Sequence, residues 1–252
     1  MIKTGIDHSK IVFLDIETVS AKHEIYDLQE SQAIAWSKVV DSKYKEELSE
    51  KVSYGMLFQK YAALFPEFGK IVCISLGYFI NATDFVVQAF SGADEKILLK
   101  RVSDELTKLS ATYKIIGGWN IKQFDIPYMV RRATIVDMNL DVRFDYFSKK
   151  PWEMTDFLDI MEVWKAGATY LGSASLESVS AAFGFNSPKE SMEGSRVSTV
   201  FYSPDQKAGL ARIGKYCNSD IIYTSTLYVR MTRGNDFLRT IKIPSNTITI
   251  VE

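Results

Sequence analysis

Runs of apolar residues bounded by polar turns predict β-strands in the first half of the chain. Residues 11–14 read Ile-Val-Phe-Leu, and β-branched and aromatic residues of this kind favour extended backbone. Residues 71–79 are almost continuously apolar, which is typical of a strand covered on both faces. Two further runs fall at residues 84–90 and 114–119, and the second contains a Gly-Gly turn. We expect these segments to form one β-sheet.

Apolar residues three and four positions apart predict helices in much of the remaining chain. Residues 95–109 place their apolar side chains on one helical face, and a further helix is expected at 124–133. From residue 157 onward the pattern is mostly helical, and its longest helix is expected at 205–231, after a Ser-Pro-Asp start signal. Early strands followed by strand–helix alternation predict an α/β fold in which a mixed β-sheet is flanked by α-helices.

We expect residues 1–252 to form a single domain, because the sequence shows no repeat, low-complexity tract or evident linker. Residues 21–67 are polar and charged over much of their length, which predicts a helical insertion after the first strand. Residues 239–252 alternate between polar and apolar positions on either side of a Pro-Ser-Asn stretch. This pattern predicts a C-terminal hairpin.

Composition limits the classes of partner. The chain has 252 residues, 46% of them hydrophobic, and a formal net charge of −1, so no global basic field attracts a polyanion. A nucleic-acid site would have to be local or use metal ions as its positive charge. Cys73 and Cys217 form no CxxC motif, and no signal peptide or apolar stretch of ~20 residues is present, which predicts a cytoplasmic protein outside the membrane.

Two carboxylates interrupt the first predicted strand. Asp15 and Glu17 follow the apolar residues 11–14, and they emerge on the same side because strand side chains alternate. Side by side in an apolar strand, they would repel each other and lose hydration, a penalty that a hard divalent cation removes. A solvated edge strand would give the same pattern, so a metal site requires further carboxylates.

Two further aspartates lie in predicted helices. Asp125 follows the Gly-Gly turn and falls in the first turn of a helix, where an aspartate commonly stabilises the helix N-terminus. Asp220 lies inside the long helix, although Asp is a poor helix former. Tyr216 is four residues earlier and therefore shares its helix face. The chain thus presents a strand Asp-x-Glu, an Asn-x-x-x-Phe-Asp after a strand, and a helical Tyr-x-x-x-Asp, in that order.

In this order the motifs resemble the ribonuclease-H-like 3′–5′ exonuclease superfamily, which carries four acidic residues and a tyrosine. Within it, the sequence is most similar to stand-alone relatives of the proofreading exonuclease domain of family B DNA polymerases. The residues that carry the resemblance are 13–18, 118–128 and 216–220, with support from 68–75 and 175–179. The histidine variant of the superfamily has a His five residues before the last Asp, where this chain has Lys215. The tyrosine (DEDDy) type therefore fits.

The resemblance implies a ribonuclease-H-like fold and a metal-dependent 3′–5′ exonuclease that hydrolyses phosphodiester bonds at the 3′ end of single-stranded DNA. It assigns two divalent ions, Mg²⁺ or Mn²⁺, to Asp15, Glu17, Asp125 and Asp220. Asp15 would bridge the ions, Glu17 and Asp220 would complete one of them, and Asp125 would serve the other. Tyr216 completes the catalytic set, where its hydroxyl would orient the attacking water or the scissile phosphate.

Three residues near the motifs are candidates for substrate contact. Asn120 could hydrogen-bond the terminal nucleotide or hold the loop before Asp125. Phe124 could stack on a terminal base, as aromatic residues do in single-strand channels, or could be a core residue under the helix start. Thr18, at the end of the first motif, is assigned to substrate binding with them.

Two other functions remain open from the sequence. A 3′–5′ exoribonuclease would use the same site with a channel that accepts the 2′-hydroxyl, and no residue decides between DNA and RNA. A nucleic-acid-binding module could keep the fold without turnover. A dinucleotide-binding protein is disfavoured, because no G-x-G-x-x-G follows a strand.

Overall fold

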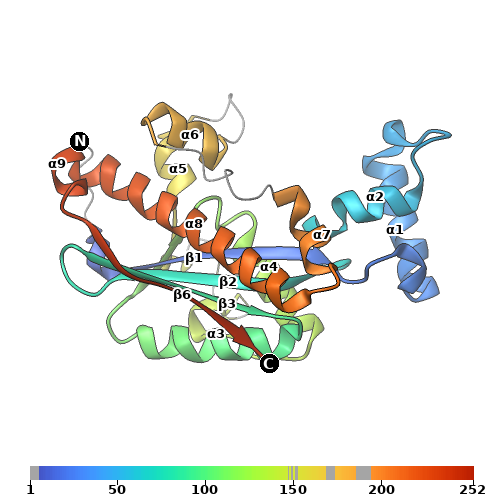
Figure 1. Cartoon of the computed structure of the whole chain (residues 1–252), viewed down its shortest axis with the longest axis horizontal. Helices are drawn as coiled ribbons and strands as arrows, with labels where there is room; N and C mark the ends of the chain where they lie inside the picture. Colours follow the sequence, from blue (N-terminus) through green and yellow to red (C-terminus); the bar gives the residue numbers. More distant parts are fainter. Residues whose placement is uncertain (1–5, 147, 149, 151–152, 169–173, 186–193) are drawn as a thin grey trace.

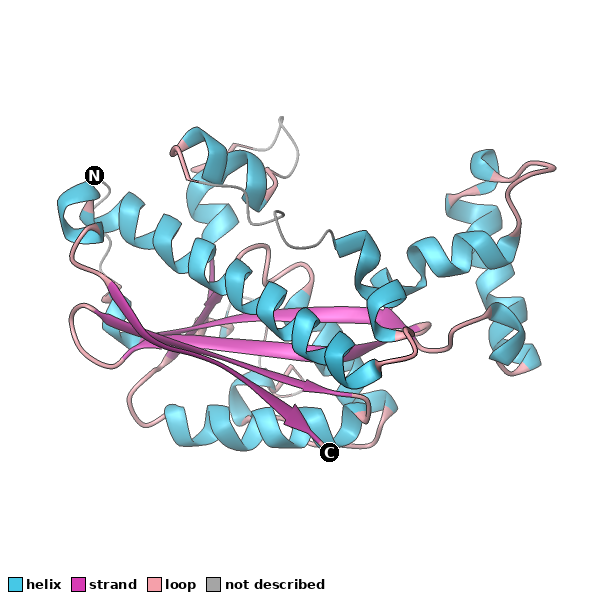
Figure 2. Cartoon of the chain, in the orientation of Figure 1, coloured by secondary structure: helices cyan, strands magenta, loops and turns pink. Residues whose placement is uncertain are grey.

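The computed structural model describes residues 6–146, 148, 150, 153–168, 174–185 and 194–252. Within these residues, six strands form one mixed sheet (Figure 2). The strands are β1 (Ile11–Ser20), β2 (Gly69–Phe79), β3 (Asp84–Gly92), β4 (Ile115–Gly118), β5 (Phe157–Asp159) and β6 (Lys242–Val251). Their order across the sheet is β5-β4-β1-β2-β3-β6. β2 runs antiparallel to both β1 and β3, whereas the β1–β4, β4–β5 and β3–β6 pairs are parallel.

Helices cover the sheet and extend beyond it. They are α1 (Glu30–Lys43), α2 (Tyr54–Tyr61), α3 (Glu95–Leu109), α4 (Asp125–Ile135), α5 (Ile160–Lys165), α6 (Leu176–Ala182), α7 (Val197–Phe201), α8 (Gln206–Arg233) and α9 (Asn235–Leu238). Figure 1 shows α8 along one face of the sheet and α3 along the other. The mixed sheet flanked by helices confirms the predicted α/β fold class.

Alternation along β1 assigns its side chains to the two faces. Val12, Leu14 and Ile16 belong to the apolar cluster that α3 and α4 cover. Ile11 and Phe13 belong to the cluster on the α8 side, with residues such as Ile221 of that helix. Asp15 and Glu17 continue this second series, so carboxylates take the next two positions on the strand face that meets α8.

Helix α8 lies close to the sheet because β2 has a glycine beneath it. A Cβ atom on Gly77 would lie 2.4 Å from Ile221 Cγ2 and 2.5 Å from a ring atom of Phe85, closer than real contacts allow. The absence of a side chain at this position therefore sets the distance between α8 and the middle of the sheet.

The predicted C-terminal hairpin is wrong, because residues 242–251 form one continuous strand, β6. β6 pairs in parallel with β3, and the register shifts between Asp84 and Val86, which pair with Lys242 and Ser245. This bulge contains Pro244, which has no backbone N–H to donate to a neighbouring strand. Proline is therefore tolerated here, at a bulge on an edge strand. The Pro-Ser-Asn stretch therefore bends the edge strand instead of turning the chain back.

Residues 157–159 form the short edge strand β5, although the sequence predicted a mostly helical chain from residue 157 onward.

The segment between β1 and β2 contains α1 and α2 and has an apolar cluster of its own. Trp36 is fully buried there, its ring edge meets Phe58 at a centroid distance of 5.4 Å, and its Nε1 donates to the Tyr54 carbonyl. In Figure 1 these two helices lie beyond one end of the sheet. No helix in the described part of the chain combines the length and apolar character needed to cross a membrane.

Candidate active site

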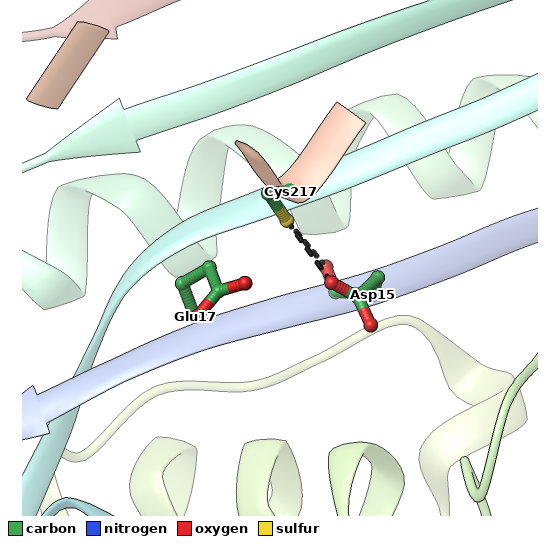
Figure 3. Close-up of side chains that lie close together, drawn as sticks. All are labelled: Asp15, Glu17 and Cys217. Atoms are coloured by element: carbon green, nitrogen blue, oxygen red, sulfur yellow. Dashed lines mark hydrogen bonds between the residues drawn. The ribbon is translucent and has the colours of Figure 1, made fainter. Parts of the chain in front are cut away.

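Asp15 and Glu17 of β1 meet Cys217 of α8. The Cys217 thiol donates to Asp15 Oδ2 at 3.3 Å and lies 3.5 Å from the Asp15 carbonyl oxygen. One ligand atom from each of the three side chains lies within 4.8 Å of the other two (Figure 3). The two carboxylates therefore share one face of β1, as the alternation of the strand predicted, and this face meets α8.

Asp125 reaches β1 along the strand's open edge. The pairing of β1 with β4 ends at Phe13 and Gly117, so later backbone groups on this side need another partner. Asp125, the first residue of α4, accepts a hydrogen bond from the backbone N–H of Ile16 at 3.0 Å. Its side chain is 4% exposed. This bond holds the Asp125 carboxylate next to the segment that carries Asp15 and Glu17.

Asp220 and Tyr216 lie one turn apart on α8, on either side of Cys217. The structure brings Asp220 within electrostatic range of Asp15, Glu17 and Asp125, because its charge contributes to a raised pKa at each of these carboxyls. The four carboxylates that the sequence singled out therefore influence one another electrostatically. Among the described residues, only Asp15 and Glu17 of the four belong to the group whose ligand atoms lie within 4.8 Å of one another.

Burial is the main electrostatic cost of this cluster. It raises the pKa of Asp15 well above its usual range, and the charges of Asp125 and Asp220 raise it further. Burial followed by the charge of Asp15 does the same to the pKa of Glu17. Burial raises the pKa of Asp125 to about 8, although the hydrogen bond from Ile16 opposes this shift. In the absence of a cation, the cluster therefore holds protons at neutral pH.

The donor set fits a hard divalent cation. Carboxylate oxygens are the ligands that Mg²⁺ and Mn²⁺ prefer, and the charge of an ion would offset the mutual repulsion of these buried groups. Asp15, Glu17, Asp125 and Asp220 are the residues that could hold such ions. Cys217 is the one sulfur in the three-residue group at the centre of the cluster.

Tyr216 remains a phenol in this setting. Burial raises the pKa of its hydroxyl, and the charges of Asp220 and Glu17 raise it further. A protonated hydroxyl donates a hydrogen bond, so Tyr216 is suited to orient a water molecule or a phosphate oxygen rather than to remove a proton.

The loop before Asp125 is shaped by backbone contacts. Asn120 adopts left-handed backbone, with φ of 58°, a conformation that Asn tolerates better than most residues. The buried carboxylate of Asp159 accepts from the backbone N–H groups of Asn120 and Lys122, and it also caps α5 through Met161 and Glu162. Asp159 therefore ties this loop to the start of α5.

The other two predicted substrate residues have structural contacts. The Phe124 ring is half-buried, packs against the cluster under α4 and lies 5.3 Å from the Tyr128 ring. The Thr18 hydroxyl donates to the Ala63 carbonyl at 2.8 Å. Both side chains therefore have structural contacts, and the described residues show no ligand-facing role for either.

Sequence reasoning missed Cys217 as a member of the site. The signal was present, since Cys217 is three residues before Asp220 and adjoins Tyr216 on the same helix. However, a cysteine in an apolar helix is commonly a core residue, and only the packing of α8 on β1 brings its sulfur to Asp15.

Comparison with known proteins agrees with this fold. The six-stranded mixed sheet flanked by helices matches the ribonuclease-H-like α/β fold. Residues 64–247 match the model of a family described as a predicted 3′–5′ exonuclease related to the exonuclease domain of PolB. The chain belongs to this family, which confirms the expected relationship and the enzyme class. The matched range includes Asp125, Tyr216 and Asp220, whereas Asp15 and Glu17 precede it.

Solved structures show the same fold. The family B DNA polymerase from the hyperthermophilic archaeon Pyrobaculum calidifontis is similar, with a TM-score of 0.52 and 15% sequence identity. The similarity covers 88% of this chain and 24% of the polymerase chain, so the protein corresponds to about a quarter of that enzyme. A comparison with curated proteins finds no match.

Proposed function

We propose that the protein is a metal-dependent 3′–5′ exonuclease of the tyrosine type that removes nucleotides from the 3′ end of single-stranded DNA. The observation that carries this proposal is that Asp15, Glu17, Asp125 and Asp220 lie within electrostatic range of one another, with Glu17 and Asp125 buried and the other two half-buried. Four carboxylates supply enough oxygens for two divalent ions, Mg²⁺ or Mn²⁺. Family membership supports the reaction class.

Each carboxylate has a distinct position for its proposed role. Asp15 is within electrostatic range of both Asp125 and Asp220, which suits a ligand shared by both ions. Glu17 and Asp220 would complete one ion, and Asp125 would serve the other from the open edge of β1. Bound divalent ions supply an activated water and neutralise the charge that develops on the phosphoryl oxygens and the leaving 3′ oxygen.

The remaining residues would orient the substrate. The Tyr216 hydroxyl, kept protonated, would donate to the attacking water or to a phosphate oxygen. The half-exposed ring of Phe124 would stack on the terminal base, and Asn120 and Thr18 would contact the terminal nucleotide. We also propose that residues 1–252 act as one exonuclease domain in a cytoplasmic setting, in keeping with two free cysteines.

The test is digestion of matched single-stranded DNA and RNA oligonucleotides in Mg²⁺, in Mn²⁺ and with a chelator. We expect DNA to be shortened only when metal is present, with RNA degraded more slowly. Faster loss of RNA would instead identify an exoribonuclease. Binding of both oligonucleotides with no digestion by the folded, metal-supplied protein would overturn the proposal and favour a binding module.

A further inference from the structure

The sulfur of Cys217 lies next to the carboxylates of Asp15 and Glu17. Its Sγ atom lies 3.3 Å from Asp15 Oδ2, and the ligand atoms of Asp15, Glu17 and Cys217 all lie within 4.8 Å of one another. The Cys217 side chain is completely buried. Figure 3 shows Cys217 beside Asp15 and Glu17, with its sulfur directed at Asp15.

Glu17 provides a second observation that points to a ligand in this space. Glu17 is 8% exposed, and no described residue donates a hydrogen bond to its carboxylate, whose oxygens keep a small contact with solvent. A buried carboxylate without a donor is costly, and a cation between it and its neighbours removes that cost.

The separation of sulfur and oxygen fits a shared metal ion. Typical zinc distances are about 2.1 Å to oxygen and 2.3 Å to sulfur, so two ligands would lie about 3.1 Å apart at a right angle and about 3.6 Å apart at a tetrahedral angle. The observed distance of 3.3 Å from Cys217 Sγ to Asp15 Oδ2 falls between these values.

We propose that Cys217 converts the Asp15–Glu17 pair into a mixed oxygen–sulfur site that binds a thiophilic divalent cation, Zn²⁺ or Cd²⁺. On binding, a sulfur–metal bond forms, the S–H bond breaks, and the proton leaves to solvent. A hard ion such as Mg²⁺ has little affinity for sulfur, so with Mg²⁺ the thiol keeps its proton and its hydrogen bond to Asp15. The inference rests on the proposed function in one respect, since it uses two of the carboxylates proposed to hold the catalytic ions.

Cys73 offers a matched control within the same fold. It is also fully buried, it pairs across the strands with Glu17, and its sulfur accepts a hydrogen bond from Ser91 Oγ at 3.3 Å. It does not belong to the three-residue group of Asp15, Glu17 and Cys217. Replacing Cys73 therefore removes a buried sulfur near the site without removing the proposed ligand.

The experiment is titration of the chelator-treated protein with Cd²⁺, followed by the ultraviolet charge-transfer absorption of a cadmium–thiolate bond. We expect this band in the wild type and in Cys73→Ser. We expect no band in Cys217→Ser. We also expect its Cd²⁺ dissociation constant to be at least about tenfold higher than that of the wild type, because even residues that only support metal ligands contribute about tenfold to affinity. Folding of each variant is checked by thermal unfolding, and Cys217→Ala replaces Cys217→Ser if the serine variant does not fold.

A band that is absent from the wild type, or that persists in Cys217→Ser, would overturn the inference. The readout does not depend on turnover, so it is separate from the nuclease test. A protein that shows the cysteine-dependent band and digests no oligonucleotide would retain this site while losing the proposed activity.

Discussion

Asn218 on α8 is hydrogen-bonded to Ser75, the residue that pairs across the strands with Asp15. Ser75 Oγ donates to Asn218 Oδ1 at 2.9 Å, and Asn218 Nδ2 donates to Asn246 Oδ1 at 2.8 Å and to the Thr247 carbonyl at 2.9 Å. The Asn218 side chain is completely buried. One amide therefore fixes α8 to both β2 and β6, and it does so between Cys217 and Asp220.

We expect Asn218→Asp to destabilise the protein and lower its activity. The replacement puts an oxygen where an N–H₂ group donates to two acceptors, and each unsatisfied buried group costs about 1–3 kcal/mol. Urea unfolding and nuclease rate check this. Ser75→Ala is the control, because it removes one donor and should cost less. An Asn218→Asp protein as stable as the wild type would contradict the proposed anchor.

We expect the metal-free protein to lose stability as the pH rises. The folded-state pKa of Asp125 is about 8 and its ordinary value is 3.8, so between these values the folded protein binds more protons than the unfolded chain. The free energy of unfolding therefore falls with increasing pH in this window. The raised pKa values of Asp15 and Glu17 act in the same direction.

Urea unfolding at several pH values between about 5 and 8, with a chelator present, measures this slope. Asp125→Asn is the matched variant, since its side-chain oxygen can still accept from Ile16 N–H while the titrating group is gone. Its slope should be shallower. A stability that rises with pH in the wild type would be inconsistent with a protonated cluster.

We expect Tyr216→Phe to slow hydrolysis without abolishing it. The substitution removes one hydroxyl donor and keeps the ring, and loss of a single positioned donor costs up to about 10²-fold to 10³-fold in rate. Asp15→Asn removes the shared metal ligand and should cost more. Initial rates on single-stranded DNA at saturating Mg²⁺ compare the two. Equal losses in both variants would indicate that Tyr216 has a larger role than orientation.

We expect Arg132→Met to weaken the attachment of α4, the helix that carries Asp125. Arg132 pairs with Glu95 of α3 at 2.6 Å, and both side chains are almost fully buried. Removing one partner of a buried ion pair costs about 3–5 kcal/mol, because the other charge is left unpaired. Thermal unfolding measures the loss. Combining Glu95→Leu with Arg132→Met should recover part of the lost stability, because an apolar pair leaves no isolated charge. The recovery should be incomplete, because the Ile71 N–H, which donates to Glu95, then has no partner.

The sequence predicted those features that depend on local alternation. The side-by-side placement of Asp15 and Glu17 follows from the period of two in a strand, and the shared face of Tyr216 and Asp220 follows from the helical repeat. The fold class followed from the order of strands and helices. In each case the nearest residues along the chain determine the geometry.

The features that were missed depend on contacts between distant segments. Pro244 and its neighbours resemble a turn in isolation, and only the bulge opposite Asp84 and Val86 lets them continue as a strand. Cys217 becomes part of the site only because Gly77 allows α8 to pack closely on β2. Asp159 ties the distant loop of Asn120 and Lys122 to the start of α5. No local pattern encodes these relationships.

The most direct test of the central claim is digestion of a 5′-labelled single-stranded DNA in Mg²⁺ by the wild type and by Asp15→Asn. The four-carboxylate site predicts progressive shortening from the 3′ end by the wild type, and no shortening by an Asp15→Asn protein that unfolds as cooperatively as the wild type. Undigested DNA with the folded wild type, or equal digestion by both proteins, would contradict the assignment of this cluster as the catalytic centre.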